Sequence, residues 1–171
     1  MKPLLNTVLA STLCLSALLL SSTACAQNPS AQAILEERLQ AETNRIVGLW
    51  SSRIEIGPCA GGPRQQLRGM NQFHLGGTLT ETGSPPPGTR GPGYGVWRFN
   101  RATQRYEARM QFLRYLPDGS FDGVSDVHRQ IRLSADGNVF VDEIVARLLN
   151  PDDTLRVELC GTAQAQRVPI L

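Results

Sequence analysis

The residues that could carry chemistry in this 171-residue chain are few and widely spaced. His74 and His128 are its only histidines, the residue type that most often acts as acid, base or metal ligand near neutral pH. The chain contains no serine nucleophile elbow, no cluster of metal ligands and no glycine-rich phosphate loop. We therefore assign no catalytic residue, no metal site and no cofactor from the sequence.

The two histidines differ in their surroundings. His128 alternates with charged and amide side chains, which predicts a solvent-exposed position. His74 stands beside the turn signal Gly76-Gly77 and could reach the mouth of a pocket. We therefore treat His74 as a candidate ligand-binding residue.

Two aspartates and two arginines lie on neighbouring expected strands. Asp122 and Asp126 share a polar face, and Arg109 and Arg114 belong to the preceding strand. Opposite charges on neighbouring strands usually pair across the outer face of a sheet, so we expect at least one such pair there. An acid–base catalytic pair would need both aspartates inside, which their alternation opposes.

The four cysteines fall into two groups. Cys14 and Cys25 lie within the first 26 residues, whereas Cys59 and Cys160 belong to the rest of the chain. An even pair in an exported protein predicts a disulfide bond between Cys59 and Cys160. The alternative is two buried free thiols.

Residues 1–26 have the pattern of a secretory signal peptide. Lys2 supplies a positive start, residues 8–20 are apolar but too short to span a bilayer stably, and Ala24-Cys25-Ala26 offers small residues for cleavage. We expect a periplasmic or secreted mature chain without a transmembrane span. The alternatives are an outer-membrane lipoprotein, lipidated at Cys25, and a leader that is really a buried helix.

After Arg45 the hydrophobic pattern has a period of two, which is typical of β-strands. Short turns such as Pro117-Asp118-Gly119 favour strands that follow one another in space. The predicted strands are 49–56, 67–74, 78–82, 94–100, 105–115, 121–133, 139–149 and 155–168. Because closure removes exposed edges, we expect residues 47–171 to form an all-β, eight-stranded antiparallel up-and-down barrel.

Two segments stand outside this pattern. Residues 27–46 predict a short amphipathic helix over 31–44, capped by Ser30 and covering one end of the barrel; the alternative is a partly ordered tail. Residues 83–93 are rich in proline and glycine and cannot pair as a strand. They predict an exposed flap at one mouth of the barrel, with a simple spacer or a proline-rich partner site as alternatives.

Closure would pair the first strand with the last. In an antiparallel pair of strands, the residue numbers of two paired residues always add up to the same sum. The sums for Cys59 with Cys160 and for Trp50 with Arg167 differ by only two, so one register with a bulge could bring both pairs together. Because successive side chains of a strand point to opposite faces, we expect Trp50 and Arg167 to point inward and the disulfide to lie on the outer face.

These residues carry a family resemblance. Gly48-Leu49-Trp50 resembles the Gly-x-Trp signature of lipocalins, members of the calycin superfamily, and Arg167 resembles the arginine that packs across that tryptophan. Residues 73–79 and 93–97 resemble a bacterial group of secreted lipocalin-like proteins without assigned function. The resemblance implies that Gly48, Trp50 and Arg167 are structural, because a guanidinium stacked on the indole would seal one end of the barrel.

An eight-stranded barrel is either filled by side chains or wide enough for one small ligand. The inward positions 161, 163 and 165 hold only glycine or alanine, which would leave space unless large residues opposite fill it. The candidate pocket residues, besides His74, are Trp97, Phe99, Tyr106, Met110 and Phe112.

We therefore expect an exported lipocalin-like barrel that binds a small apolar ligand. The alternatives are a small enzyme of the cyclase or isomerase type, and an interaction protein that uses its flap while the barrel is filled. A haem-binding barrel, as in nitrobindin-like calycins, would use His74 as its iron ligand. The net charge of +2 without a dense basic cluster argues against a nucleic-acid partner, and the oligomeric state stays open.

Overall fold

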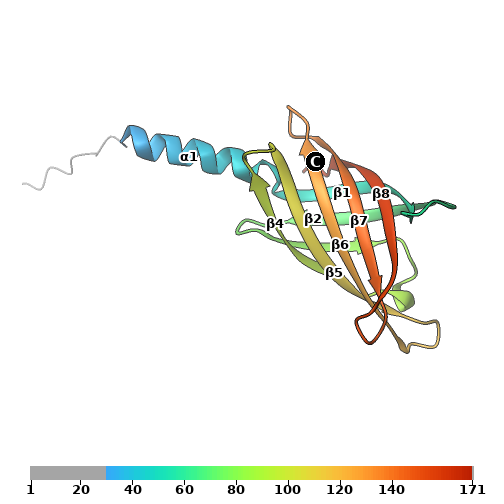
Figure 1. Cartoon of the computed structure of the whole chain (residues 1–171). Coiled ribbons are helices and arrows are strands. Elements are labelled where there is room, and N and C mark those ends of the chain that lie inside the picture. The colour runs from blue at the N-terminus through green and yellow to red at the C-terminus, as the bar shows by residue number, and fades with distance from the viewer. Residues whose placement is uncertain (1–29, 171) are drawn as a thin grey trace, which may run out of the picture.

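A computed structural model describes residues 30–170 and shows a closed antiparallel barrel of eight strands (Figure 1). Each strand pairs with the next along the chain, and the last pairs with the first, which confirms the predicted fold class. The strands are β1 (Gly48–Pro58), β2 (Gln65–Phe73), β3 (Thr78–Gly83), β4 (Gly93–Asn100), β5 (Arg105–Tyr115), β6 (Phe121–Leu133), β7 (Val139–Leu149) and β8 (Leu155–Arg167). The predicted signal peptide and the alternative lipidation of Cys25 lie outside the described residues.

The helix α1 (Ala31–Thr43) forms as predicted, but the expectation that it covers the barrel is wrong. Ser30 caps it, since the Ser30 Oγ accepts a hydrogen bond from the Ala33 amide at 3.2 Å. None of its residues is buried, and the helix extends away from the strands (Figure 1). Its apolar stripe is too narrow for a core-facing helix, and Leu35 is 56% exposed. Within residues 30–170, no helix is long and apolar enough to cross a membrane.

The segment after α1 seals this end of the barrel instead. The 3-10 helix η1 (Asn44–Ile46) buries Ile46 completely, and the Trp50 Nε1 donates a hydrogen bond to the Ile46 carbonyl at 2.8 Å. The Arg167 guanidinium lies 4.3 Å from the centre of the Trp50 ring and also donates to the Val47 carbonyl at 2.7 Å. A single arginine thus covers the indole and ties the start of β1 to the end of β8.

Gly48 allows this close approach. Its φ of +136° is one that other residues rarely adopt, and a Cβ there would lie 2.6 Å from the Arg167 Nη1. The three residues of the lipocalin resemblance, Gly48, Trp50 and Arg167, therefore form one packed unit at the sealed end.

The pairing of β1 with β8 places Trp50 opposite Arg167 as predicted, but without the expected bulge. Trp50 pairs with Arg167, and Gly57 pairs with Cys160 without interruption. Cys59 lies two residues beyond Gly57, which accounts for the difference in index sums, and it forms the predicted disulfide with Cys160 at a Cα–Cα distance of 4.8 Å. A disulfide fits a protein that folds in an oxidising compartment.

Replacing Trp50 by alanine should lower the free energy of unfolding by about 3–5 kcal/mol, because the change removes a fully buried indole. Denaturant unfolding followed by circular dichroism measures the loss. Leu49→Ala is the matched control, since Leu49 is the neighbouring β1 residue but is 37% exposed, and it should cost much less. A loss below about 1 kcal/mol for Trp50→Ala would contradict the packing described here.

Reduction of the disulfide should lower the melting temperature. The bond joins residues separated by 101 positions, and closing so long a loop stabilises a fold by roughly 4–5 kcal/mol at most in the chain-entropy model. Calorimetry with and without reductant measures the change, and the Cys59→Ser/Cys160→Ser double variant should reproduce it. An unchanged melting curve, with thiols that react before reduction, would show that the bond is absent.

Candidate functional site

The half of the barrel away from Trp50 contains a cavity of about 150 Å³. It lies at the end that carries the loop between β3 and β4. Apolar side chains from β1, β5, β6 and β7 line it, including Ile54, Ile56, Met110, Phe112, Val127 and Ile144. The wall also contains polar and charged residues, which are Gln65, Arg68, Asn71, Glu81, Arg90, Ser125 and Arg129. The strand alternation read from the sequence therefore turns apolar side chains toward this cavity, on one side of the barrel's midpoint.

The flap predicted over 83–93 lies at the mouth of this cavity. It contains the 3-10 helix η2 (Pro87–Thr89), and Pro85 lines the cavity. Both of its ends are tied to strands, because the Ser84 amide donates to the Arg68 carbonyl at 2.8 Å and the Gly91 amide to the Leu113 carbonyl at 2.9 Å. The flap is thus part of the cavity wall.

Glu81 of β3 and Arg90 of the flap form a buried ion pair at the cavity wall. The Nη1 and Nη2 atoms of Arg90 donate to the two carboxylate oxygens of Glu81 at 3.2 and 2.5 Å. The guanidinium also lies 3.8 Å from the centre of the Phe112 ring. Two glycines provide the room, since a Cβ on Gly83 would overlap the Arg90 Nη1 and a Cβ on Gly93 would lie 2.8 Å from the Glu81 Oε2.

A second buried network separates the cavity from the sealed half. The Arg129 Nε donates to the Asp142 Oδ2 at 2.5 Å, and its Nη1 donates to the Asn71 Oδ1 at 2.6 Å. The Asn71 amide in turn donates to the Ser52 Oγ at 2.8 Å. Burial raises the pKa of the Asp142 carboxyl, and the charge of Arg129 opposes that shift. Arg129 lines the cavity on one side and lies 5.5 Å from the Phe140 ring centre on the other.

The predicted pocket residues divide between the two halves of the barrel. Met110 and Phe112 line the cavity. Three others belong to a chain of aromatic contacts that fills the sealed half, in which neighbouring ring centroids lie 4.8 to 6.2 Å apart. The members of this aromatic chain are Trp50, Phe140, Phe73, Trp97, Tyr106 and Phe99.

The small inward positions of β8 serve packing. Ala165 pairs with Phe140 on one side and Ser52 on the other, and it is fully buried. Ala163 pairs with Asp142 on one side and with Ile54 on the other. Large neighbours therefore fill the space that was expected beside these positions, and the cavity lies further toward the flap.

Neither histidine lines the cavity. His74 lies between β2 and β3 at the sealed end, with its Nε2 3.3 Å from the Thr80 Oγ1. The side chain of His128 is 51% exposed, as predicted, and its Nε2 lies 3.6 Å from an Asp126 oxygen. In the part of the chain that the structure describes, no group of three or more potential metal ligands comes together.

Sequence reasoning missed the four charged residues inside the barrel, which are Glu81, Arg90, Arg129 and Asp142. For two of them the sequence contains a pattern that predicts an inward-facing position. Arg129 alternates with the apolar residues of β6 that face inward, and Asp142 does so on the neighbouring strand β7. Opposite charges on the inward faces of paired strands predict a buried ion pair. Arg90 gave no such signal, because it lies in a loop.

The predicted Asp–Arg pairs form outside the cavity. Arg109 pairs with Asp126 at 2.8 Å, and this hydrogen bond holds the pKa of the Asp126 carboxyl below its ordinary value. Arg114 pairs with Asp122 at 3.1 Å near the turn between β5 and β6.

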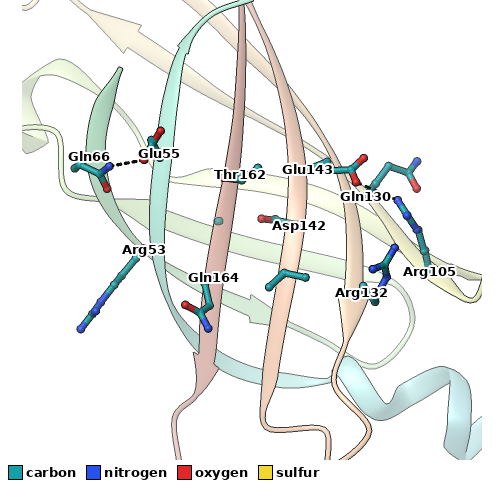
Figure 2. Close-up of a pocket in the computed structure, with 12 residues that line it drawn as sticks. Arg53, Glu55, Gln66, Arg105, Gln130, Arg132, Asp142, Glu143, Thr162 and Gln164 are labelled. Atoms are coloured by element: carbon teal, nitrogen blue, oxygen red, sulfur yellow. Dashed lines mark hydrogen bonds and ion pairs between the residues drawn. The ribbon is translucent and has the colours of Figure 1, made fainter. Parts of the chain in front are cut away.

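A larger groove of about 560 Å³ lies on the outer face of the barrel. Figure 2 shows its charged and amide side chains, with Glu55 and Gln66 turned toward each other at 2.8 Å. Charges of both signs are mixed along it, and one edge carries the Arg105–Glu143 pair at 3.5 Å. Solvated surface charges of this kind do not select an apolar ligand, so the interior cavity is the stronger candidate site.

Comparison with protein-family models finds no match, and comparison with curated proteins finds none of significant similarity. The function is therefore argued from the cavity and its wall.

Asp142→Ala should destabilise the fold by about 3–5 kcal/mol, because it leaves the Arg129 guanidinium buried without its counter-ion. The double variant Arg129→Met/Asp142→Leu removes both charges and should recover much of that loss. Urea unfolding measures both effects.

Asp126→Ala is the matched control for this prediction. Asp126 is itself buried on the outer side of β6, but the Arg109 side chain that the change leaves behind is 55% exposed and stays hydrated, so the cost should be clearly smaller. A loss for Asp142→Ala no larger than that for Asp126→Ala would contradict the buried network.

Proposed function

We propose that this protein is an exported lipocalin-like barrel that binds a small apolar molecule in the cavity beneath the flap. The closed eight-stranded order and the packing of Gly48, Trp50 and Arg167 at one end support the family assignment. The Cys59–Cys160 disulfide supports export. The observation that carries the binding proposal is the apolar cavity of about 150 Å³.

The size of the cavity limits the ligand. A protein cavity of roughly 150 Å³ has room for a molecule of the size of benzene. The aromatic chain of the sealed half blocks deeper entry, so a long ligand would have to displace the flap. The proposed ligand class is therefore monocyclic or short-chain apolar molecules.

The charges inside the barrel favour binding over the cyclase or isomerase alternative. A general acid or base must be able to exchange a proton with the bound molecule. Both oxygens of Glu81 accept hydrogen bonds from Arg90, and Asp142 is held by Arg129. Glu81, the one carboxylate among the described residues that line the cavity, is thus engaged through both oxygens, which fits a structural role for it. Asp142 does not line the cavity, although its Oδ1 has no hydrogen-bond partner among residues 30–170.

Methionine methyl groups provide the test of this proposal. Met110 lines the cavity, whereas Met70 is 38% exposed on the outer face of β2 and serves as an internal control. In protein labelled with ¹³C at its methionine methyls, benzene should shift the Met110 signal in a saturable way and leave the Met70 signal in place.

A cavity-filling variant completes the experiment. Ala146→Leu adds three carbon atoms at a lining position and should abolish the Met110 response to benzene. Val145→Leu enlarges the neighbouring residue, which is 41% exposed, and should leave that response unchanged. The proposal fails if benzene does not affect Met110 in the wild type, or if the folded Ala146→Leu variant responds as the wild type does.

A further inference from the structure

We infer that the ligand is an uncharged apolar molecule with one hydrogen-bond acceptor oxygen, such as a carbonyl, and that the Arg90 Nε–H donates to this oxygen. The inference rests on the proposed function and specifies the chemistry of its ligand. It comes from one buried atom of Arg90, a residue that lines the cavity, for which the fold supplies no hydrogen-bond partner.

The Arg90 Nε is buried and has no hydrogen-bond partner among residues 30–170. The side chain is only 8% exposed, and Arg90 lines the cavity. Buried N–H groups in native proteins are rarely left without a partner, because water no longer satisfies them. A ligand oxygen in the cavity would supply the missing acceptor.

The guanidinium is held so that this N–H cannot find a partner elsewhere. Its two terminal nitrogens are engaged by Glu81, and its plane lies against the Phe112 ring. Gly83 and Gly93 provide the close-fitting space in which the ion pair lies. The backbone of Arg90 is fixed as well, since it forms a β-bridge with Arg114. A donor held in this way needs no rearrangement to bind an oxygen.

The same geometry argues for an uncharged ligand. Glu81 already neutralises Arg90, and Asp142 neutralises Arg129, the other buried guanidinium of the cavity wall. A ligand carboxylate inside the cavity would therefore lose its hydration beside two guanidiniums that are already neutralised, and it would lie close to Glu81. The third arginine of the wall, Arg68, is exposed to solvent. A carbonyl, ether or similar oxygen carries no such penalty. Because Arg90 belongs to the flap, that oxygen would lie at the mouth and the apolar part of the ligand would point inward.

Styrene and benzaldehyde are matched probes for this inference. Both are planar and of nearly equal size, but styrene ends in a CH₂ group where benzaldehyde ends in an oxygen atom. Affinities follow from the Met110 methyl signal in each variant. The test variant, Arg90→Met/Glu81→Leu, removes both members of the buried pair. The control, Arg109→Met/Asp126→Leu, makes the same two changes on the outer face.

The preference for benzaldehyde over styrene should fall by about tenfold or more in the test variant, as expected for the loss of a hydrogen bond from a charged donor. In the control variant, this preference should be the same as in the wild type. In the wild type, ¹⁵N NMR should also show the Arg90 Nε–H signal shifting with benzaldehyde but not with styrene, a readout that does not depend on the variant folding.

Three results would overturn the inference, and they separate it from the proposed function. In the first, benzaldehyde does not shift the Arg90 Nε–H signal, and the test variant keeps the wild-type preference for benzaldehyde over styrene, while styrene still binds. Arg90 then does not recognise an oxygen, but the apolar site stands. If benzoate binds more tightly than benzaldehyde, the ligand class is anionic. If neither styrene nor benzaldehyde shifts Met110 in the wild type, the inference and the proposed function both fail.

Discussion

The contact between the Arg167 guanidinium and the Trp50 indole determines how this barrel is divided. It exists only because β8 pairs with β1, and it brings together residues at opposite ends of the described chain. The contact seals one end and leads into the chain of aromatic side chains that fills the adjoining half. The cavity lies toward the flap, where the inward residues include no such chain of aromatic contacts. The location of the cavity is in this sense a consequence of how the opposite end is closed.

Charge inside the barrel is arranged as two neutral pairs. Arg129 with Asp142 lies between the two halves, and Arg90 with Glu81 lies at the cavity mouth. Buried charges are tolerated when they are paired and hydrogen-bonded, and here each carboxylate contacts an arginine directly. The pairs give the cavity polar edges without net charge. The proposed ligand would then be selected by shape and by a single hydrogen bond to Arg90, rather than by electrostatic attraction.

Much of this fold could be predicted from the sequence, because its determinants are local. Alternating apolar residues located all eight strands, turn residues located their ends, and the index sums located the β1–β8 register and the disulfide. The helix α1 was found, but its packing was not, because an isolated apolar stripe does not reveal what it faces. The site was predicted only in part: Met110 and Phe112 line the cavity, whereas Arg90 does so from a loop whose path no pattern specifies. Which inward residues meet, and what volume they leave, depends on three-dimensional packing.

One half of the barrel is filled by aromatic side chains, and we propose that the cavity in the other half holds a small apolar guest. Diffraction from crystals under xenon pressure tests it most directly, because xenon enters apolar cavities of this size without needing a polar partner. We expect one interior xenon site, bounded by Met110, Phe112 and Ile144. A barrel without xenon in that half, or xenon bound instead among Trp97 and Tyr106, would contradict it.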